Sequence, residues 1–214
     1  MSIAAKICGV SSAEAVAAAV EGGARYVGFV FYPPSPRAVD PAAAERLAAL
    51  VPQAVLKVGL FVDAEDAAIA AALDRVPLDL LQFHGGESAE RVVAARRRFD
   101  RPIVKAVPIA GPEDLALAEG YQQAADLLLF DARPPRRPEA LPGGNGLAFD
   151  WELLAGRSWR VPWMLSGGLT AERLAEAVRV SGATIVDVSS GVERRPGDKD
   201  PALIRAFLAA ARAL

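Results

Sequence analysis

Short apolar runs alternate strictly with alanine-rich amphipathic stretches along the whole chain. The apolar runs are rich in β-branched and aromatic residues and are bounded by glycine, proline or polar residues, which is typical of strands buried on both faces. Because a helical stretch follows each run, the strands are expected to lie parallel in one sheet. Eight runs are predicted to be strands: 3–8, 26–31, 56–62, 80–84, 103–107, 127–131, 161–166 and 185–189.

The number and spacing of these units favour a closed barrel. An open doubly wound sheet also satisfies the alternation, but it usually carries a glycine fingerprint after its first strand, and none is present. Eight strand–helix pairs in 214 residues leave no room for a second domain. We therefore predict one (β/α)8 TIM barrel, an α/β fold, spanning residues 1–214.

The helical stretches carry recognisable start signals. Ser11 is predicted to cap the first helix, with Glu14 completing a capping box. Asp40-Pro41 and Asp200-Pro201 are predicted to begin the second and the last helix, because proline is favoured at the first helical position. Residues 149–154 are predicted to form a short sixth helix. The remaining helices are expected to begin at 63, 86–88, 111–113 and 170–172.

Composition limits the cellular context and the partners. The formal net charge is -2 and no long basic block occurs, which argues against nucleic-acid binding. The single cysteine, Cys8, excludes an internal disulfide and fits a reducing compartment. The chain has no apolar stretch long enough to cross a bilayer and no pattern of a secretory signal. We expect a cytoplasmic protein without membrane contact, either a monomer or a small homodimer.

Two glycine-containing turns near the C-terminus point to a phosphate site. Ser166-Gly167-Gly168 follows the seventh predicted strand, and Ser189-Ser190-Gly191 follows the eighth. Glycine allows a backbone to approach an anion closely, so that exposed N–H groups point at it. In (β/α)8 barrels a phosphate is frequently held by these two loops. Two ordinary strand-to-helix turns are the alternative, although their occurrence on adjacent strands favours phosphate.

Residues at the C-terminal ends of the strands are the candidates for chemistry, because active sites of this fold lie there. Cys8 is either a small buried hydrophobe or a catalyst, and Lys6 on the same strand face could lower the pKa of its thiol. Asp131 is either a turn-stabilising group or a catalyst. Arg37 lies in a stiff loop that could direct its guanidinium toward a carboxylate. His84 is interpreted as a packed histidine, and no ligand spacing indicates a metal site.

One loop is longer than the others. Residues 131–147 show no helical or strand pattern and contain Pro134, Pro135, Pro138 and Pro142. Loops of this length are uncommon in compact domains. Because this loop leaves the predicted active face, a lid over a ligand and a solvated excursion are equally plausible interpretations.

Several motifs, in order from residue 6 to about residue 200, together resemble the phosphoribosylanthranilate isomerases of tryptophan biosynthesis. By this resemblance, Cys8 is the general base and Asp131 the general acid. Arg37 pairs with the anthranilate carboxylate. The family usually has threonine where Asn145 stands. The motifs are Lys6-Ile7-Cys8-Gly9, Gly28-Phe29-Val30-Phe31 with Ser35-Pro36-Arg37, Gln82-Phe83-His84-Gly85, Phe130-Asp131, Gly143-Gly144-Asn145-Gly146 with Phe149-Asp150-Trp151, Ser166-Gly167-Gly168-Leu169, and Val186-Asp187-Val188-Ser189-Ser190-Gly191-Val192-Glu193 with Pro196-Gly197-Asp198-Lys199-Asp200.

The resemblance also implies the substrate contacts. The two C-terminal turns bind the ribose phosphate, so the expected substrate-binding residues on and beside them are Gly167, Gly168, Asp187, Ser189, Ser190 and Gly191. The implied reaction is an Amadori rearrangement of N-(5-phosphoribosyl)anthranilate to an aminoketose. It transfers no electrons or groups to another molecule and therefore needs no cofactor.

The acid and the base must act on one sugar. Asp131 has to hold a proton to act as an acid, which burial beside Leu129 and the loop, or a negative neighbour such as Asp187, would favour. The competing hypotheses are another sugar-phosphate isomerase on a phosphate-binding barrel and a non-catalytic phosphate-binding barrel. A first strand that ends in cysteine argues against the isomerase of histidine biosynthesis, whose acid–base pair is two aspartates.

Overall fold

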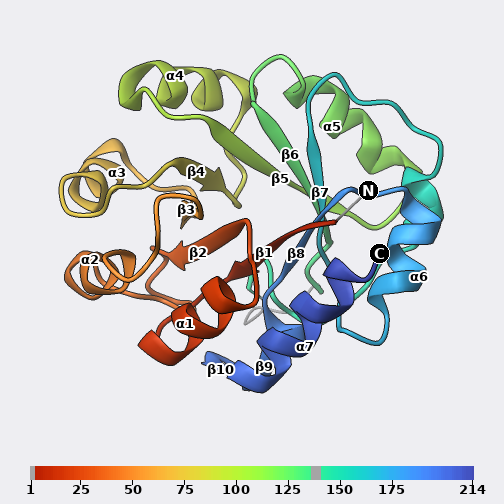
Figure 1. Ribbon diagram of the computed structural model, residues 1–214. Helices are drawn as coiled ribbons and strands as arrows, with labels where there is room; N and C mark the ends of the chain where they lie inside the picture. Colours follow the sequence, from red (N-terminus) through yellow and green to blue (C-terminus); the bar gives the residue numbers. More distant parts are fainter. Residues whose placement is uncertain (1–2, 136–140) are drawn as a thin grey trace.

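In the computed structural model, which describes residues 3–135 and 141–214, eight parallel strands close into a barrel. Each strand pairs with the next along the chain, and β1 pairs with β8 to complete the circle, with Lys6 opposite Asp187. Figure 1 shows the helices around the outside of these strands. The strands are β1 (Ala4–Cys8), β2 (Tyr26–Val30), β3 (Leu56–Phe61), β4 (Leu80–Phe83), β5 (Ile103–Ile109), β6 (Leu127–Ala132), β7 (Trp163–Leu165) and β8 (Ile185–Val188).

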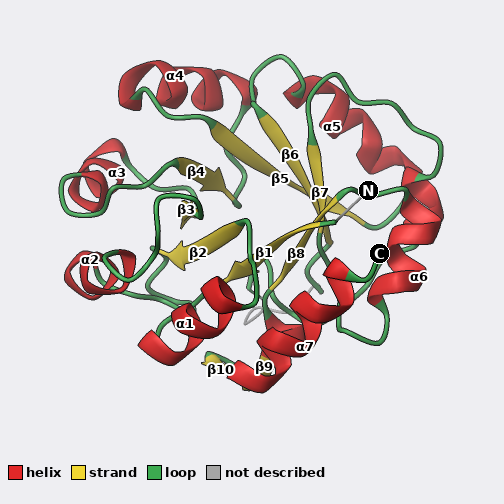
Figure 2. Cartoon of the chain, in the orientation of Figure 1, coloured by secondary structure: helices red, strands yellow, loops and turns green. Residues whose placement is uncertain are grey.

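The predicted single-domain TIM barrel is confirmed, and each predicted strand overlaps an observed one. The α-helices alternate with the strands, as Figure 2 shows in red and yellow, except between β6 and β7, where no α-helix occurs among the described residues. After β8 a short antiparallel hairpin of β9 (Glu193–Arg195) and β10 (Asp198–Lys199) precedes the last helix. The helices are α1 (Ala13–Glu21), α2 (Pro41–Ala48), α3 (Asp66–Leu73), α4 (Ala89–Phe99), α5 (Leu115–Tyr121), α6 (Leu174–Ser181) and α7 (Pro201–Arg212).

Three predicted helix starts are confirmed, including the one at 86–88, where Ser88 caps α4, and one is shifted by a residue. Asp40 and Asp200 accept hydrogen bonds from backbone N–H groups in the first turns of α2 and α7. The cap of α1 is Ser12 rather than Ser11, because Ser12 has the extended backbone and its hydroxyl oxygen accepts from the Ala15 N–H at 3.2 Å.

Other helix boundaries differ more. The predicted sixth helix is a single 3₁₀ turn, η2 (Trp151–Leu154), which begins at the cap Asp150 and ends before Gly156, whose φ is +66°. Asp63 has a φ of +46°, so α3 begins only after Glu65. The segment at 111–113 forms a short 3₁₀ turn, η1 (Pro112–Asp114), before α5, and α6 begins at Leu174 rather than near 170.

The core has two layers that follow from the alternation of side chains along each strand. The larger layer lies between strands and helices and includes Phe29, Phe61 and Phe207, all buried. A smaller apolar layer fills the lower barrel interior with Val58, Val104 and other strand residues. Within the described ranges, no helix is both long and apolar enough to cross a membrane.

Candidate active site

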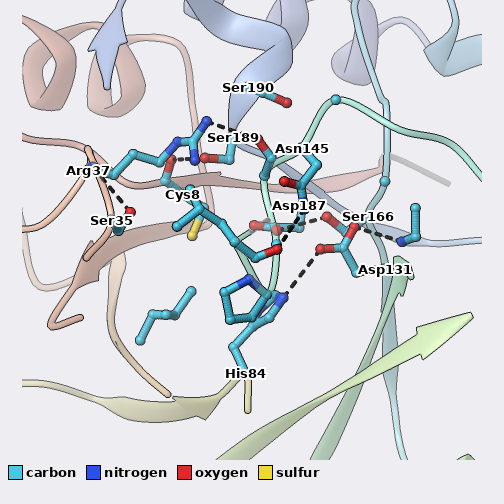
Figure 3. A pocket seen from close by; sticks show the side chains of 18 of the residues that line it. Cys8, Ser35, Arg37, His84, Asp131, Asn145, Ser166, Asp187, Ser189 and Ser190 are labelled. Atoms are coloured by element: carbon cyan, nitrogen blue, oxygen red, sulfur yellow. Dashed lines mark hydrogen bonds and ion pairs between the residues drawn. The ribbon is translucent and has the colours of Figure 1, made fainter. Parts of the chain in front are cut away.

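A pocket opens at the C-terminal ends of the strands, where the fold leads us to expect chemistry. It encloses about 740 Å³ of empty space, part of it open to solvent. Every residue predicted for the site lies in its lining: Cys8, Arg37, Asp131, Gly167, Gly168, Asp187, Ser189, Ser190 and Gly191. Figure 3 shows the Cys8 sulfur and the Asp131 carboxyl approaching this pocket from different sides.

Cys8, at the end of β1, lies above a buried ion pair. Lys6 is on the same face of β1, one side-chain repeat below, and its Nζ lies 2.8 Å from Oδ1 of Asp187 on β8. The other Asp187 oxygen accepts from the Ser166 hydroxyl at 3.1 Å. Burial alone would lower the pKa of Lys6, but Asp187 and Cys8 raise it, so the ammonium stays charged.

Lys6 lowers the pKa of the Cys8 thiol, as expected, but the net shift is upward rather than downward. Burial raises the pKa of Cys8 above its ordinary value, and the attraction of Lys6 offsets only part of that rise. The reason is that the Lys6 charge is already paired with Asp187, whose own negative charge raises the pKa of Cys8 further. The resting group is therefore a thiol rather than a thiolate at neutral pH.

Asp131, in β6, contacts a histidine that the sequence interpretation set aside. Oδ2 of Asp131 lies 3.3 Å from Nε2 of His84, and Oδ1 accepts from the Ala132 N–H at 2.9 Å. His84 follows β4, is itself in the pocket lining, and places its Nδ1 2.9 Å from Nε2 of Gln82. His84 is thus packed, as interpreted, but its packing partner is the candidate acid.

The guanidinium of Arg37 is held from outside the pocket by Glu193. Two bonds of 2.7 and 2.8 Å join Nε and Nη2 of Arg37 to the two carboxylate oxygens of Glu193. Lys199 donates to the same carboxylate at 2.6 Å. Burial opposes the charge on Glu193, but these two cations hold its pKa below the ordinary value. The paired arginine therefore has a defined orientation and lines the pocket.

The two glycine turns lie side by side at the pocket, as predicted. Gly167 and Gly168 have φ values of +88° and +63°, which other residues rarely adopt. Neither of their N–H groups donates to an acceptor within residues 3–135 and 141–214. A Cβ on Gly191 would overlap the Leu169 carbonyl oxygen of the other turn, so the two turns approach as closely as glycine allows.

Ser189 contributes to the fold as well as to the pocket. Its hydroxyl donates to the Cys8 carbonyl oxygen at 3.1 Å, and Lys199 donates to its hydroxyl oxygen at 3.1 Å. Its side chain ties β8 to the end of β1. Ser190 begins a short 3₁₀ turn, η3 (Ser190–Val192), at the pocket edge.

The long loop after β6 contributes to one wall of the pocket. Residues 141–147 line it, and Nη2 of Arg37 donates to the Gly144 carbonyl oxygen at 3.1 Å. Asn145 donates from its side chain to the Leu141 carbonyl oxygen. Pro138 and the rest of 136–140 lie outside the described residues. The lid interpretation is therefore supported only by the position of the later half of the loop.

Three residues near the site were not singled out as functional from the sequence. Glu193 and Lys199 occur in the quoted motifs, yet nothing local links them to Arg37, 156 positions away from Glu193. Gln82 is fully buried below His84. Within the described part of the chain, no three His, Cys, Asp or Glu side chains are grouped as metal ligands.

Known proteins resemble this chain over nearly its whole length. Residues 5–210 match the family model described as N-(5'phosphoribosyl)anthranilate (PRA) isomerase. An N-(5'-phosphoribosyl)anthranilate isomerase of Rhodospirillum centenum is 59% identical over 214 residues, covering 100% of both chains. The Thermotoga maritima phosphoribosyl anthranilate isomerase structure is 36% identical, with a TM-score of 0.87, covering 99% of this chain and 100% of that one.

A further solved structure carries a ligand. It is a phosphoribosyl anthranilate isomerase in complex with reduced 1-(o-carboxyphenylamino)-1-deoxyribulose 5-phosphate. That chain is 34% identical, with a TM-score of 0.83, covering 99% of this chain and 100% of its own length.

Proposed function

The chain belongs to the N-(5'-phosphoribosyl)anthranilate isomerase family, and from that premise we propose that Cys8 and Asp131 catalyse the reaction as general base and general acid. The protein is an isomerase of tryptophan biosynthesis. Membership of this family along the full length argues against the two competing hypotheses, which were another sugar-phosphate isomerase and a non-catalytic phosphate-binding barrel.

The chemistry needs one proton donor and one proton acceptor on one sugar. Asp131 gives a proton to the ribose ring oxygen as the bond from that oxygen to C1 breaks, which leaves an iminium ion. Cys8 then removes the proton from C2, and the electrons of the C2–H bond form an enolamine. Protonation at C1 and loss of the hydroxyl proton at C2 give the ketone, so all atoms and electrons remain in the substrate.

One observation carries this assignment: the only thiol of the chain and the Asp131 carboxyl line the same pocket, which the two glycine turns also line. General acid–base groups that are well placed contribute about 10²–10⁴-fold each. The raised pKa of Cys8 has a consequence for the base step. Fewer enzyme molecules hold a thiolate at neutral pH, but each thiolate is a stronger base.

The substrate is held at both ends. The phosphate is bound by the free N–H groups of Gly167 and Gly168, with Ser190 and Gly191 on the adjacent turn. Arg37 receives the anthranilate carboxylate, and the nearby apolar wall of Val30 and Leu60 suits the aromatic ring. Two fixed ends place the sugar between Cys8 and Asp131, which supplies much of the rate by orientation.

The assignment is tested by following anthranilate fluorescence during turnover of freshly made substrate. Cys8→Ala and Asp131→Asn are each expected to lower kcat by about 100-fold or more while Tm stays near that of the unchanged protein. Asp74→Asn, at an exposed position after α3, is the matched control and should retain full activity. Near-normal kcat in either pocket variant would remove that residue from the proposed mechanism.

Location and assembly stay predictions. The cytoplasmic location is supported by the single cysteine, which is buried and free. The assembly, a monomer or a homodimer, is tested by sedimentation of the purified chain across a range of concentrations.

A further inference from the structure

A chain of contacts leads from the barrel interior to the candidate acid. Gln82 on β4 is fully buried and its Nε2 lies 2.9 Å from Nδ1 of His84. Nε2 of the same imidazole lies 3.3 Å from Oδ2 of Asp131. Figure 3 shows His84 directed at Asp131. His84, which lines the pocket, is therefore contacted from below by the Gln82 amide, which does not line the pocket.

An amide nitrogen can only donate a hydrogen bond, whereas a neutral imidazole nitrogen donates or accepts according to where its proton is. Because Nε2 of Gln82 faces Nδ1, Nδ1 must accept, and the ring proton must be on Nε2. His84 then donates toward Asp131. Within the described residues, the Gln82 carbonyl oxygen is buried without a hydrogen-bond partner, and the amide nitrogen is the Gln82 atom that faces His84.

We propose that Gln82 is a positioning residue that fixes His84 in the Nε2–H tautomer, so that His84 donates a hydrogen bond to Asp131 during acid catalysis. This inference rests on the proposed function for the role of Asp131. The donated bond stabilises the carboxylate that is left when Asp131 gives its proton to the ring oxygen. The Ala132 N–H does the same at the other carboxyl oxygen.

The other tautomer would have the opposite effect. A proton on Nδ1 would turn the lone pair of Nε2 toward Asp131, and that lone pair would compete with the substrate for the carboxyl proton. The amide of Gln82 thereby decides whether the imidazole assists or opposes proton transfer.

The remaining charged groups near the end of β4 have other partners. Asp63 accepts from the Gly86 N–H at 2.7 Å. Glu87 accepts from the Gly85 N–H and pairs with Lys105, whose Nζ lies 2.9 Å away. Lys105 also donates to the Gly85 carbonyl oxygen at 2.7 Å. These bonds are made to the turn that follows His84, and Asp131 is the charged group that faces the ring itself.

His84 is the only histidine of the chain, so nitrogen-15 NMR of the uniformly labelled protein reports its tautomer without assignment. At about pH 8, above the ordinary titration range of histidine, we expect Nε2 to carry the proton and Nδ1 to be bare. A spectrum in which Nδ1 carries the proton overturns the proposal. It would mean that the carbonyl oxygen of Gln82 faces the ring.

Two variants extend the test. Gln82→Glu replaces the donor with a carboxylate that only accepts, so the ring proton is expected to move to Nδ1 and kcat to fall about 10- to 100-fold with KM nearly unchanged. Gln82→Met removes the donor at similar volume and should give a mixed tautomer and a smaller loss. Gln123→Glu, an exposed glutamine after α5, is the control and should change neither.

The outcomes separate this inference from the proposed function. A tautomer shift in Gln82→Glu without any loss of kcat overturns the role of Gln82, even if Asp131→Asn is inactive. If Asp131→Asn is fully active while Nε2 carries the proton, the role of Asp131 fails, and with it the catalytic part of this proposal. Should both variants fail to fold, the spectrum of the unchanged protein still decides the tautomer.

Discussion

The state of the thiol at Cys8 depends on its neighbours more than on its place at the end of a strand. Lys6 lies below it and favours the thiolate, but the Asp187 carboxylate, 2.8 Å from the ammonium, opposes this effect. Burial therefore dominates and raises the pKa of Cys8. A single cysteine makes this residue directly measurable.

We expect Cys8 to react with iodoacetamide slowly at neutral pH. Only the thiolate is alkylated, so the rate should rise as pH passes the raised pKa, with a midpoint above the ordinary thiol value of about 8.5. The rate is measured by mass spectrometry over a pH series.

Lys6→Met is the comparison for that experiment. It removes a charge that favours the thiolate, so the midpoint should move to still higher pH. A midpoint below the ordinary value in the unchanged protein would contradict the burial effect.

At the scale of elements, the β9–β10 hairpin supports the pocket from outside its lining. It brings Glu193 and Lys199 against Arg37, which comes from the loop between β2 and α2. The bidentate pair orients the guanidinium in one plane. The hairpin lies between the turn at residues 189–191 and α7 in the chain, so one segment adjoins both ends proposed to hold the substrate.

Glu193→Gln is expected to raise KM about tenfold, equivalent to about 1.4 kcal/mol, with a smaller effect on kcat. The amide cannot hold both Arg37 nitrogens as acceptor, so the guanidinium loses its fixed orientation. The measurement is steady-state kinetics with the fluorescence assay.

Asp198→Asn is a matched control in the same hairpin, because its ion pair with Arg195 is solvent-exposed and worth little. An equal rise of KM in both variants would show that the hairpin is sensitive to any change of charge. The role of Glu193 in orienting Arg37 would then be withdrawn.

For the whole molecule, the critical seam is where the first and last strands pair. β1 and β8 are 181 residues apart at the Lys6–Asp187 pair, and their pairing closes the barrel. Helix α7 covers this seam and packs against both α1 and β1. Its side chains Ile204, Phe207 and Leu208 are buried there.

Phe207→Ala should therefore destabilise the folded barrel by about 3–5 kcal/mol, because it removes a buried aromatic ring and leaves a cavity. Urea unfolding followed by tryptophan fluorescence measures the change. Leu203→Ala on the exposed side of the same helix should cost much less. Similar losses in both variants would mean that α7 contributes through helix formation rather than through the seam.

Much of the architecture could be predicted from local patterns. The apolar runs at 3–8, 26–31 and later positions located all eight strands. A strand that is buried on both faces is apolar along its whole length, so it is easily recognised in the sequence. Helix boundaries were predicted less well. Ser11 and Ser12 are equally good caps in sequence, and the backbone conformation that selects Ser12 depends on where β1 ends.

The candidate site, too, was only partly predictable from the sequence. The sequence by itself determined the barrel, the thiol and carboxyl at strand ends, and the two glycine turns, because each follows from residue type and position within one strand–helix unit. Only the tertiary structure decided which charged and polar groups are paired: Lys6 with Asp187, Arg37 with Glu193, and His84 between Gln82 and Asp131. The physical reason is that pKa values and tautomers depend on burial and on charges a few ångströms away in space, and most of those neighbours come from other strands of the closed barrel.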